Sequence, residues 1–135
     1  MRDILKTVTL PVNGENSTFR LRKLDAFSGA KLLRALSQAQ EEASPESPLT
    51  LTDLLFSLPE EELERTERAC LAHAELELPA GPIPVFRDGV WGLPELEYET
   101  ETCLKLTLEV MSWTLAGFFR ESARPGSPEA RTTSR

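Results

Sequence analysis

The sequence predicts an α+β fold, in which an N-terminal β-hairpin is followed by a mainly helical domain that ends in a long helix. Three observations support this class. Two segments near the N-terminus alternate apolar and polar residues, as half-buried strands do. Apolar residues then recur at helical spacing, most extensively over about 95–121. A chain of 135 residues also has the usual size of one domain. We expect a single domain over 1–122 and a disordered polar tail over 123–135.

The predicted hairpin covers residues 4–23. Asn13-Gly14 separates its two alternating segments, and both residues tolerate the positive φ that tight hairpin turns require. Pro11 has no amide hydrogen to donate, so the first strand is expected at the edge of its sheet. The apolar faces of the two strands carry Val8, Leu10, Val12, Phe19 and Leu21.

Four helices are predicted, at about 26–42, 51–57, 58–75 and 95–121. The third begins in Ser57-Leu58-Pro59-Glu60, which has the spacing of a capping box. Its few apolar residues suggest that this helix lies on the surface of the domain.

A proline-rich connector is expected between the last two helices. Residues 79–84 contain three prolines, which disfavour a helix. Asp88-Gly89 then favours a second, small hairpin around a tight turn, although an ordered loop would have the same sequence pattern.

The last helix is apolar on nearly all sides, which is typical of a helix enclosed by more than one partner. Leu106 and Trp113 project opposite the predicted core face, so we assign them to a surface that meets another chain. Phe119, Trp91 and Phe86 are added to the predicted partner-binding residues because large rings often anchor interfaces. For the rings, packing in the core is the alternative. The predicted core face carries Leu104, Leu108, Met111, Leu115, Phe118 and Phe119.

The charge is distributed unevenly. The net charge of −7 argues against nucleic-acid binding, which requires a basic surface. Residues 41–101 carry sixteen acidic and three basic side chains. This segment is either a solvated surface that keeps the protein soluble or an acidic surface that attracts a basic partner. No stretch approaches the roughly 18 apolar residues of a membrane span, so no membrane contact is expected.

No set of residues predicts catalysis. His73 is the only histidine, and its spacing of three from Cys70 on one helix also arises by chance. Cys70 and Cys103 are predicted to be buried free thiols rather than a disulfide or a metal pair. Phosphate-binding glycine loops, CxxC and HExxH motifs do not occur.

Alternating carboxylates precede the last helix. Glu97, Glu99 and Glu101 would point to different sides of a helix, whereas acid–base chemistry or metal binding requires side chains that converge. We therefore expect no enzyme, no metal site and no cofactor.

Two blocks of the sequence carry a family resemblance. The first is KTVTLPVNGENSTFRLRKLDAFSGAKLLRAL, from Lys6 to Leu36, and the second runs from Leu104 to Ser122 and ends in FFRES. Between the blocks, Leu54-Leu55 and the segment from Glu61 to Leu71 fit the same spacing of apolar residues. In these segments the chain resembles the tail assembly chaperones of long-tailed bacteriophages and related prophages.

The resemblance implies a small protein of the host cytoplasm that is absent from the finished virion. It would hold the tape-measure protein soluble while the tail tube polymerises around it. The family often also makes an extended, frameshifted product that recruits tail-tube subunits, and a linker to such an extension would begin at 124–135.

Because the long helix is apolar on nearly all sides, a second copy of the chain is a further candidate partner. The alternative function is a small acidic adaptor or secretion-type chaperone for another client.

Overall fold

The predicted α+β class is confirmed by a computed structural model, which describes residues 5–42 and 50–122, the last six of these as backbone alone. The predicted tail at 123–135 and the first residue of the predicted hairpin, at position 4, lie outside the described residues. In chain order the elements are β1 (Leu5–Val12), β2 (Glu15–Arg22), α1 (Ala26–Glu42), α2 (Leu51–Ser57), α3 (Glu60–Ala72), β3 (Ala74–Leu78), β4 (Gly81–Pro84), β5 (Phe86–Arg87), β6 (Val90–Trp91), the 3-10 helix η1 (Pro94–Tyr98) and α4 (Thr100–Ser122).

The predicted N-terminal hairpin is present and forms the edge of a larger sheet. Four antiparallel strands pair in the order β1-β2-β3-β4. Asn13 and Gly14 make the turn with φ of 55° and 84°, a conformation that non-glycine residues seldom adopt but asparagine tolerates. Pro11 pairs with Asn16 on the edge strand, where its missing amide hydrogen leaves no partner unsatisfied.

The predicted end of the third helix, at residue 75, is wrong. The helix stops at Ala72, and the following residues form β3, which pairs with β2 so that Leu76 lies opposite Phe19. The predicted connector at 79–84 supplies β4, the other edge strand. Strand β3 depends on hydrogen bonds to residues more than fifty positions earlier, so local helical spacing could not reveal it.

The small second hairpin is confirmed as β5 and β6. Phe86 pairs with Trp91 across a turn in which Asp88 and Gly89 have φ of 56° and 78°. The long helix starts later than predicted, because Pro94–Tyr98 forms a separate 3-10 helix before it.

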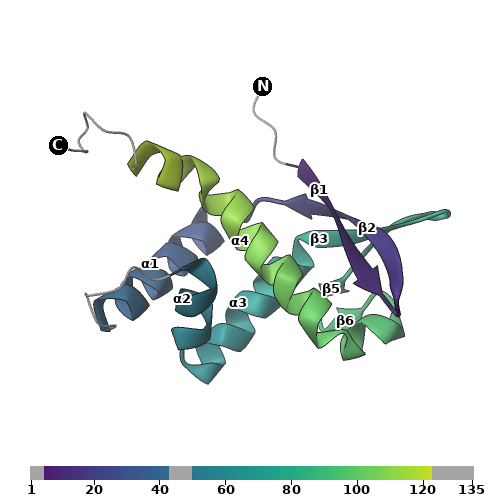
Figure 1. The fold of residues 1–135 in the computed structure, drawn as a ribbon, viewed down its shortest axis with the longest axis horizontal. Coiled ribbons are helices and arrows are strands. Elements are labelled where there is room, and N and C mark those ends of the chain that lie inside the picture. The colour runs from purple at the N-terminus through teal and green to yellow at the C-terminus, as the bar shows by residue number, and fades with distance from the viewer. Residues whose placement is uncertain (1–4, 43–49, 123–135) are drawn as a thin grey trace.

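Helix α4 is the central element of the molecule. In Figure 1 it runs diagonally across the view, with the sheet to its right and α1 and α2 to its left. It contacts β1 and β2 on one side and α3 on another. The side chains that α4 buries are Thr102, Cys103, Leu106, Thr107, Val110, Met111 and Leu115.

The predicted core face of α4 is therefore rotated by about a quarter of a turn from the observed one. Leu106, assigned to a partner surface, is completely buried. Leu104 and Leu108, assigned to the core, are only half-buried. The prediction followed the largest apolar side chains, whereas the buried arc is centred near Cys103 and Thr107.

Two threonines make this rotation favourable because their hydroxyls are satisfied. Thr107 Oγ1 donates a hydrogen bond of 2.9 Å to the carbonyl of Cys103, one turn earlier. Thr102 Oγ1 donates to the carbonyl of Pro11 at 2.6 Å. A buried hydroxyl costs little when it is hydrogen-bonded, so these polar residues can lie in the core.

Polar contacts at both ends of the buried face hold α4 against the hairpin. At the turn, the amide of Asn13 donates to Glu99 Oε2 at 2.8 Å. Where β2 leads toward α1, the amide of Leu24 donates to Thr114 Oγ1 at 2.9 Å. These bonds define how α4 lies along the strands.

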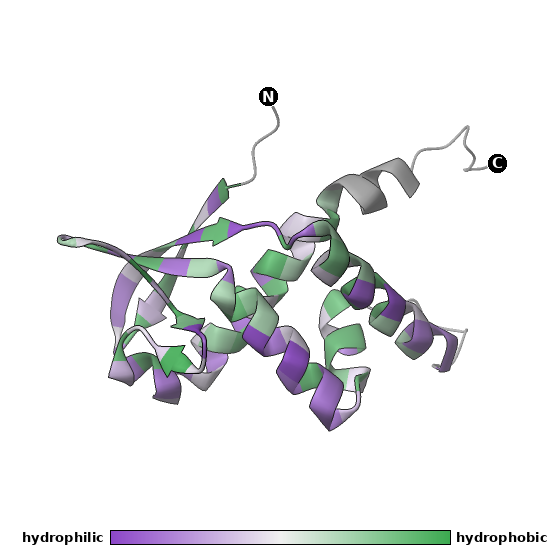
Figure 2. Ribbon diagram, turned by 180° about the vertical axis from the view of Figure 1, so that it is seen from behind, coloured by the Kyte–Doolittle hydropathy of each residue, from purple (hydrophilic) through white to green (hydrophobic). Residues whose placement is uncertain are grey.

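Helix α3 has an exposed side, as its composition suggested, and Figure 2 shows hydrophilic residues along it. Its other side is not peripheral, because Cys70 and Leu71 are buried. This side packs against α4.

Two glycine-to-alanine substitutions should have opposite effects on stability. A Cβ at Gly29 in α1 would meet Thr114 Cγ2 at an ordinary 3.5 Å, whereas one at Gly92 would overlap the carbonyl oxygen of Pro84. Gly29→Ala should raise the free energy of unfolding by about 0.5–1 kcal/mol through helix propensity. Gly92→Ala should lower it by about 1–3 kcal/mol. Urea denaturation of the two variants tests this, and equal effects would contradict the packing at Gly92.

The rotation of α4 can be measured with a pair of leucine truncations. Leu106→Ala should cost about 2–5 kcal/mol of unfolding free energy because it leaves a cavity in the core. Leu108→Ala removes the same atoms from a half-buried position and should cost clearly less. If Leu108→Ala were the more damaging substitution, the buried face would be the one predicted from sequence.

Candidate functional site

The five predicted partner-binding residues do not form one surface. Leu106 lies in the core, so its assignment is wrong. The side chain of Phe119 lies outside the described residues. Phe86 is buried, and Trp91 and Trp113 are half-buried.

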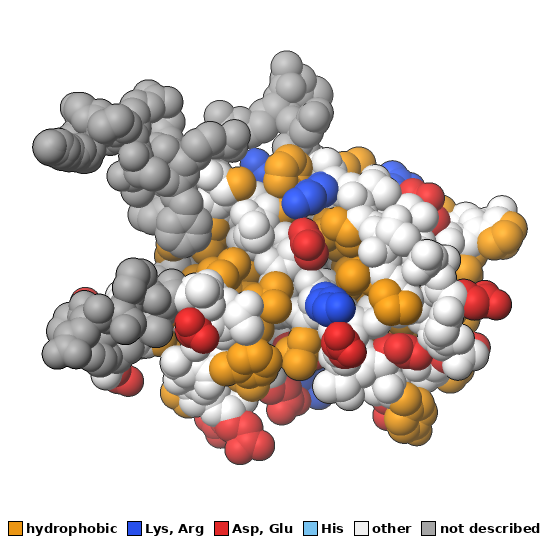
Figure 3. Space-filling model, viewed as in Figure 1, with side chains coloured by type: hydrophobic (Ala, Val, Ile, Leu, Met, Phe, Trp, Pro, Cys, Tyr) orange, Lys and Arg blue, Asp and Glu red, His pale blue; other side chains and the backbone are white. Residues whose placement is uncertain are grey.

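Trp113 lies beneath two lysines at the open end of the hairpin. Lys23 Nζ is 4.7 Å and Lys6 Nζ is 5.8 Å from the ring centroid, which are cation–π distances. Lys6 also pairs with Glu109, one turn before Trp113 on α4, at 3.3 Å. Two of the protein's own cations therefore lie close to this half-buried ring. Figure 3 shows acidic and basic side chains mixed along this part of the surface.

Phe86 and Trp91 do come together, at a hollow of about 320 Å³ beside α3. Their ring centroids are 4.7 Å apart and the rings are tilted by 56°. Carboxylates of α3 and η1 complete the lining, which suits a cationic side chain better than an apolar one. One cation of the chain is already there, since Arg68 Cζ lies 5.2 Å from the Phe86 centroid. The hollow is lined by Glu64, Glu67, Arg68, Leu71, Phe86, Trp91, Glu97, Thr100 and Cys103.

The surroundings of this hollow disfavour the ionised forms of two groups that line it, the Glu67 carboxyl and the Cys103 thiol. Partial burial, with the nearby Glu64 carboxylate, raises the pKa of Glu67. Burial, with Glu67 and Glu99, raises the pKa of the Cys103 thiol to about 11. A bound cation would relieve the repulsion between these groups.

A larger groove lies between α1 and α3, with a volume of about 480 Å³. Its floor is partly apolar: the buried Leu32 and Ala35 of α1 and the half-buried Ala69 of α3 contribute to it, together with Leu24. Its α1 side carries two cations, Lys31 and Arg34, both exposed. On the α3 side, Arg65 is paired with Glu62 on the same helix. The groove is lined by Leu24, Ser28, Lys31, Leu32, Arg34, Ala35, Gln38, Glu62, Arg65, Thr66 and Ala69.

None of the residues that line this groove comes from α4. Gly29 of α1 meets α4 at Thr114, and the small residues Ala35 and Ala39 are buried. What sequence reasoning missed was the contribution of α3. A partial signal was available, since Lys31, Arg34 and Gln38 recur at a spacing of three to four on α1.

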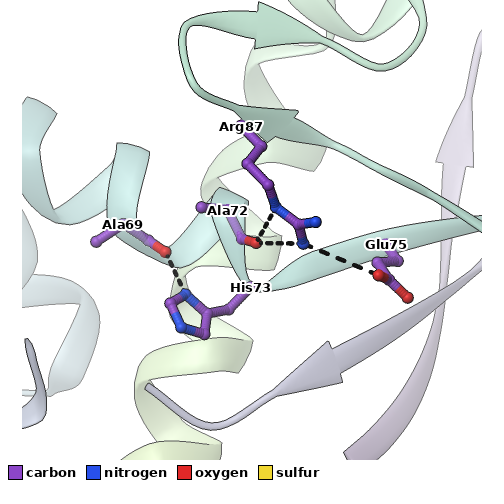
Figure 4. A network of polar contacts seen from close by, with 5 residues as sticks. All are labelled: Ala69, Ala72, His73, Glu75 and Arg87. Atoms are coloured by element: carbon purple, nitrogen blue, oxygen red, sulfur yellow. Dashed lines mark hydrogen bonds and ion pairs between the residues drawn. The ribbon is translucent and has the colours of Figure 1, made fainter. Parts of the chain in front are cut away.

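A third hollow, of about 390 Å³, opens on the face of the sheet that points away from α4. Arg20 and Arg22 reach it from β2, and Arg87 reaches it from β5. His73 and Glu75 lie at the start of β3, as Figure 4 shows. The two arginines of β2 could have been grouped from sequence, because residues two apart share one face of a strand.

Cys70 and His73 do not form a nucleophile and its base. His73 Nδ1 lies 2.9 Å from the carbonyl of Ala69. Burial raises the pKa of Cys70 to about 12, the opposite of the lowered pKa that a reactive thiol requires. Both cysteines are buried and free, as predicted.

The alternating glutamates lie in three separate places and do not converge. Glu99 accepts from the hairpin turn, Glu101 pairs with Lys105 at 3.1 Å, and Glu97 lines the aromatic hollow. Over residues 5–42 and 50–122, no three histidine, cysteine or acidic side chains are grouped to hold a metal ion. No helix in that part of the chain is long and apolar enough to cross a membrane.

Glu67→Gln should stabilise the protein in a pH-dependent way. The raised pKa means that folding disfavours the ionised carboxylate, so the cost is absent below the ordinary carboxyl range, near pH 4.5, and appears as pH rises through the higher pKa of the folded state. The variant should therefore melt at a higher temperature than wild type at pH 7, and the difference should vanish at pH 4. Glu61→Gln, on the same helix, controls for the loss of one negative charge. An equal gain at both pH values would contradict this origin.

The described residues thus hold three hollows of different character: an apolar groove with cations along one side, an aromatic and acidic hollow, and an arginine-lined hollow. In comparisons with known proteins, no family model, curated protein or solved structure matches the chain.

Proposed function

We propose that this protein is a bacteriophage tail assembly chaperone that binds the tape-measure protein in the groove between α1 and α3. The identity of the client rests on the family resemblance of the opening and closing sequence blocks. The binding role rests on one observation, the partly apolar floor that Leu32, Ala35 and Ala69 give this groove. In this proposal the protein binds another chain and catalyses no reaction.

The groove suits one face of an amphipathic helix. Helices bind grooves by inserting apolar residues at i, i+3, i+4 and i+7. Leu32 and Ala35 on one side and Ala69 on the other offer apolar contacts. Lys31 and Arg34 would lie beside the polar flank of the client, where acidic residues would be favoured.

Weak binding by several copies fits the task. A tape-measure protein is long and helical and would aggregate if its apolar seams stayed exposed before assembly. Several chaperones bound along one client cover those seams together, yet each can leave as the tube advances. The net charge of −7 keeps such a complex soluble. Recruitment of tail-tube subunits would belong to an extended product.

The alternative, an adaptor or secretion-type chaperone for another client, is favoured by a different observation. The hollow of Phe86 and Trp91 combines aromatic rings with a half-buried carboxylate, Glu67. This combination would accept a lysine or arginine from a basic partner. The neighbouring genes distinguish the two functions: a tube gene and a very long gene favour the tail chaperone, and an effector or toxin gene favours the adaptor.

Co-expression with the tape-measure protein of the same phage tests the proposal. Wild-type chaperone should move that protein from the pellet to the soluble fraction. Gln38→Trp should abolish this effect, because Gln38 is exposed and lines the groove, so that an indole would fill it. Gln40→Trp is the matched control, since Gln40 is exposed on the same helix but does not line the groove.

Both tryptophan variants should keep the wild-type thermal melt, because both positions are exposed. Tape-measure protein that stays insoluble with wild-type chaperone would overturn the function. Rescue by wild type together with equal activity of the two variants would overturn the groove as the binding site.

A further inference from the structure

Three guanidinium groups line a hollow on the outer face of the sheet, although the chain as a whole is acidic. Arg20 and Arg22 lie two residues apart on β2, and Arg87 approaches from β5 across the hollow of about 390 Å³. Glu75 is the single carboxylate that lines the hollow. The site is separate from the groove between α1 and α3.

The hollow has a fixed frame. The Arg87 guanidinium donates from Nε and Nη2 to the carbonyl of Ala72, at 3.3 and 2.9 Å, which satisfies the last turn of α3 (Figure 4). The amide of Arg22 donates to the carbonyl of His73 at 2.9 Å. His73 in turn is held through Nδ1 by Ala69. Backbone bonds between the end of α3 and the sheet therefore position the charged side chains.

The charges in this frame are incompletely neutralised. Arg87 Nη2 and Glu75 Oε2 are 3.8 Å apart, and Arg20 Nε and Glu77 Oε2 are also 3.8 Å apart. Both separations exceed a hydrogen bond. Among the described residues, the Arg22 side chain has neither a hydrogen bond nor an ion pair.

We propose that this hollow binds an oxyanion, a carboxylate or a phosphate, between the guanidinium groups of Arg20, Arg22 and Arg87. Planar guanidinium groups present paired N–H donors that match two oxygens of such a group. Arg20 and Arg22 can use such pairs, whereas Arg87, whose Nε and Nη2 donate to Ala72, would contribute its remaining N–H groups and its charge. Glu75 acts as an internal competitor, held too far from Arg87 to hydrogen-bond to it. An incoming oxyanion at about 2.8 Å replaces this weak contact with charge-assisted hydrogen bonds.

The source of the oxyanion is either a free ion or the acidic side chains of a peptide. NMR titrations of uniformly ¹⁵N-labelled protein distinguish them, with inorganic phosphate in one arm and an acetylated tetraglutamate peptide in the other, at constant ionic strength. Binding at this site should cause saturable chemical-shift changes that are confined to the backbone amides of residues 20–22, 73–75 and 87. Saturation by phosphate assigns the site to free oxyanions, and saturation by the peptide alone assigns it to protein-borne carboxylates.

Three variants test which residues bind. Arg22→Gln should raise the dissociation constant about tenfold, the loss expected for one charge-assisted hydrogen bond. Lys105→Gln, which removes an exposed cation of α4 that lies outside the hollow, should leave it unchanged. Glu75→Gln should lower the dissociation constant by removing the competitor, a gain that misfolding cannot produce. The absence of saturable shifts with either probe, equal losses in Arg22→Gln and Lys105→Gln, or weaker binding by Glu75→Gln would each overturn the proposal.

Discussion

Burial of one face of α4 is the constraint on which the rest of the structure depends. Leu106, Val110 and Met111 are fully buried between the strands and α3, so sheet and helices share one core and neither layer closes without α4. The hydrogen bonds of Thr102 and Thr107 permit this orientation, because they satisfy hydroxyls that would otherwise be costly to bury. An apolar helix in a domain of this size is thus explained by its own fold.

This arrangement determines where binding can occur. Because most of α4 lies in the core, the hollows are formed mainly by the elements around it: α1 with α3, α3 with the β5–β6 hairpin and the first turn of α4, and the outer face of β2 with the end of α3. Helix α3 borders all three. The sequence suggested that this helix was peripheral, yet it organises the surface as well as packing against α4.

The surface charge is also local rather than uniform. An overall charge of −7 is compatible with the proposed chaperone function, and several of the cations lie at two hollows. Lys31 and Arg34 border the apolar groove, while Arg20, Arg22 and Arg87 surround the hollow on the sheet. A client helix with an acidic flank and a separate oxyanion would therefore bind at different places. The aromatic hollow near Glu67 has the opposite preference, for a cation.

The sequence by itself determined the elements whose signals are local. Asn13-Gly14 and Asp88-Gly89 specify their turns through backbone conformations that few other residues adopt, and the bounds of α1 and α2 follow from helical spacing. The Asp88-Gly89 turn also predicts that the strands on either side of it pair, which makes Phe86 and Trp91 neighbours.

Only the tertiary structure decided the features that depend on distant partners. Strand β3 pairs with the distant β2 as well as with β4. Helix α4 buries the face that packs against the strands and α3, where the hydroxyls of Thr102 and Thr107 are hydrogen-bonded. A prediction from apolar spacing considers only the size and polarity of side chains. It therefore assigned Leu106 to a partner surface and Leu108 to the core. The groove and the arginine hollow arise where α3 meets elements far away in the chain. Sequence spacing can therefore group only the residues that one element contributes, such as Arg20 with Arg22, and not the complete lining.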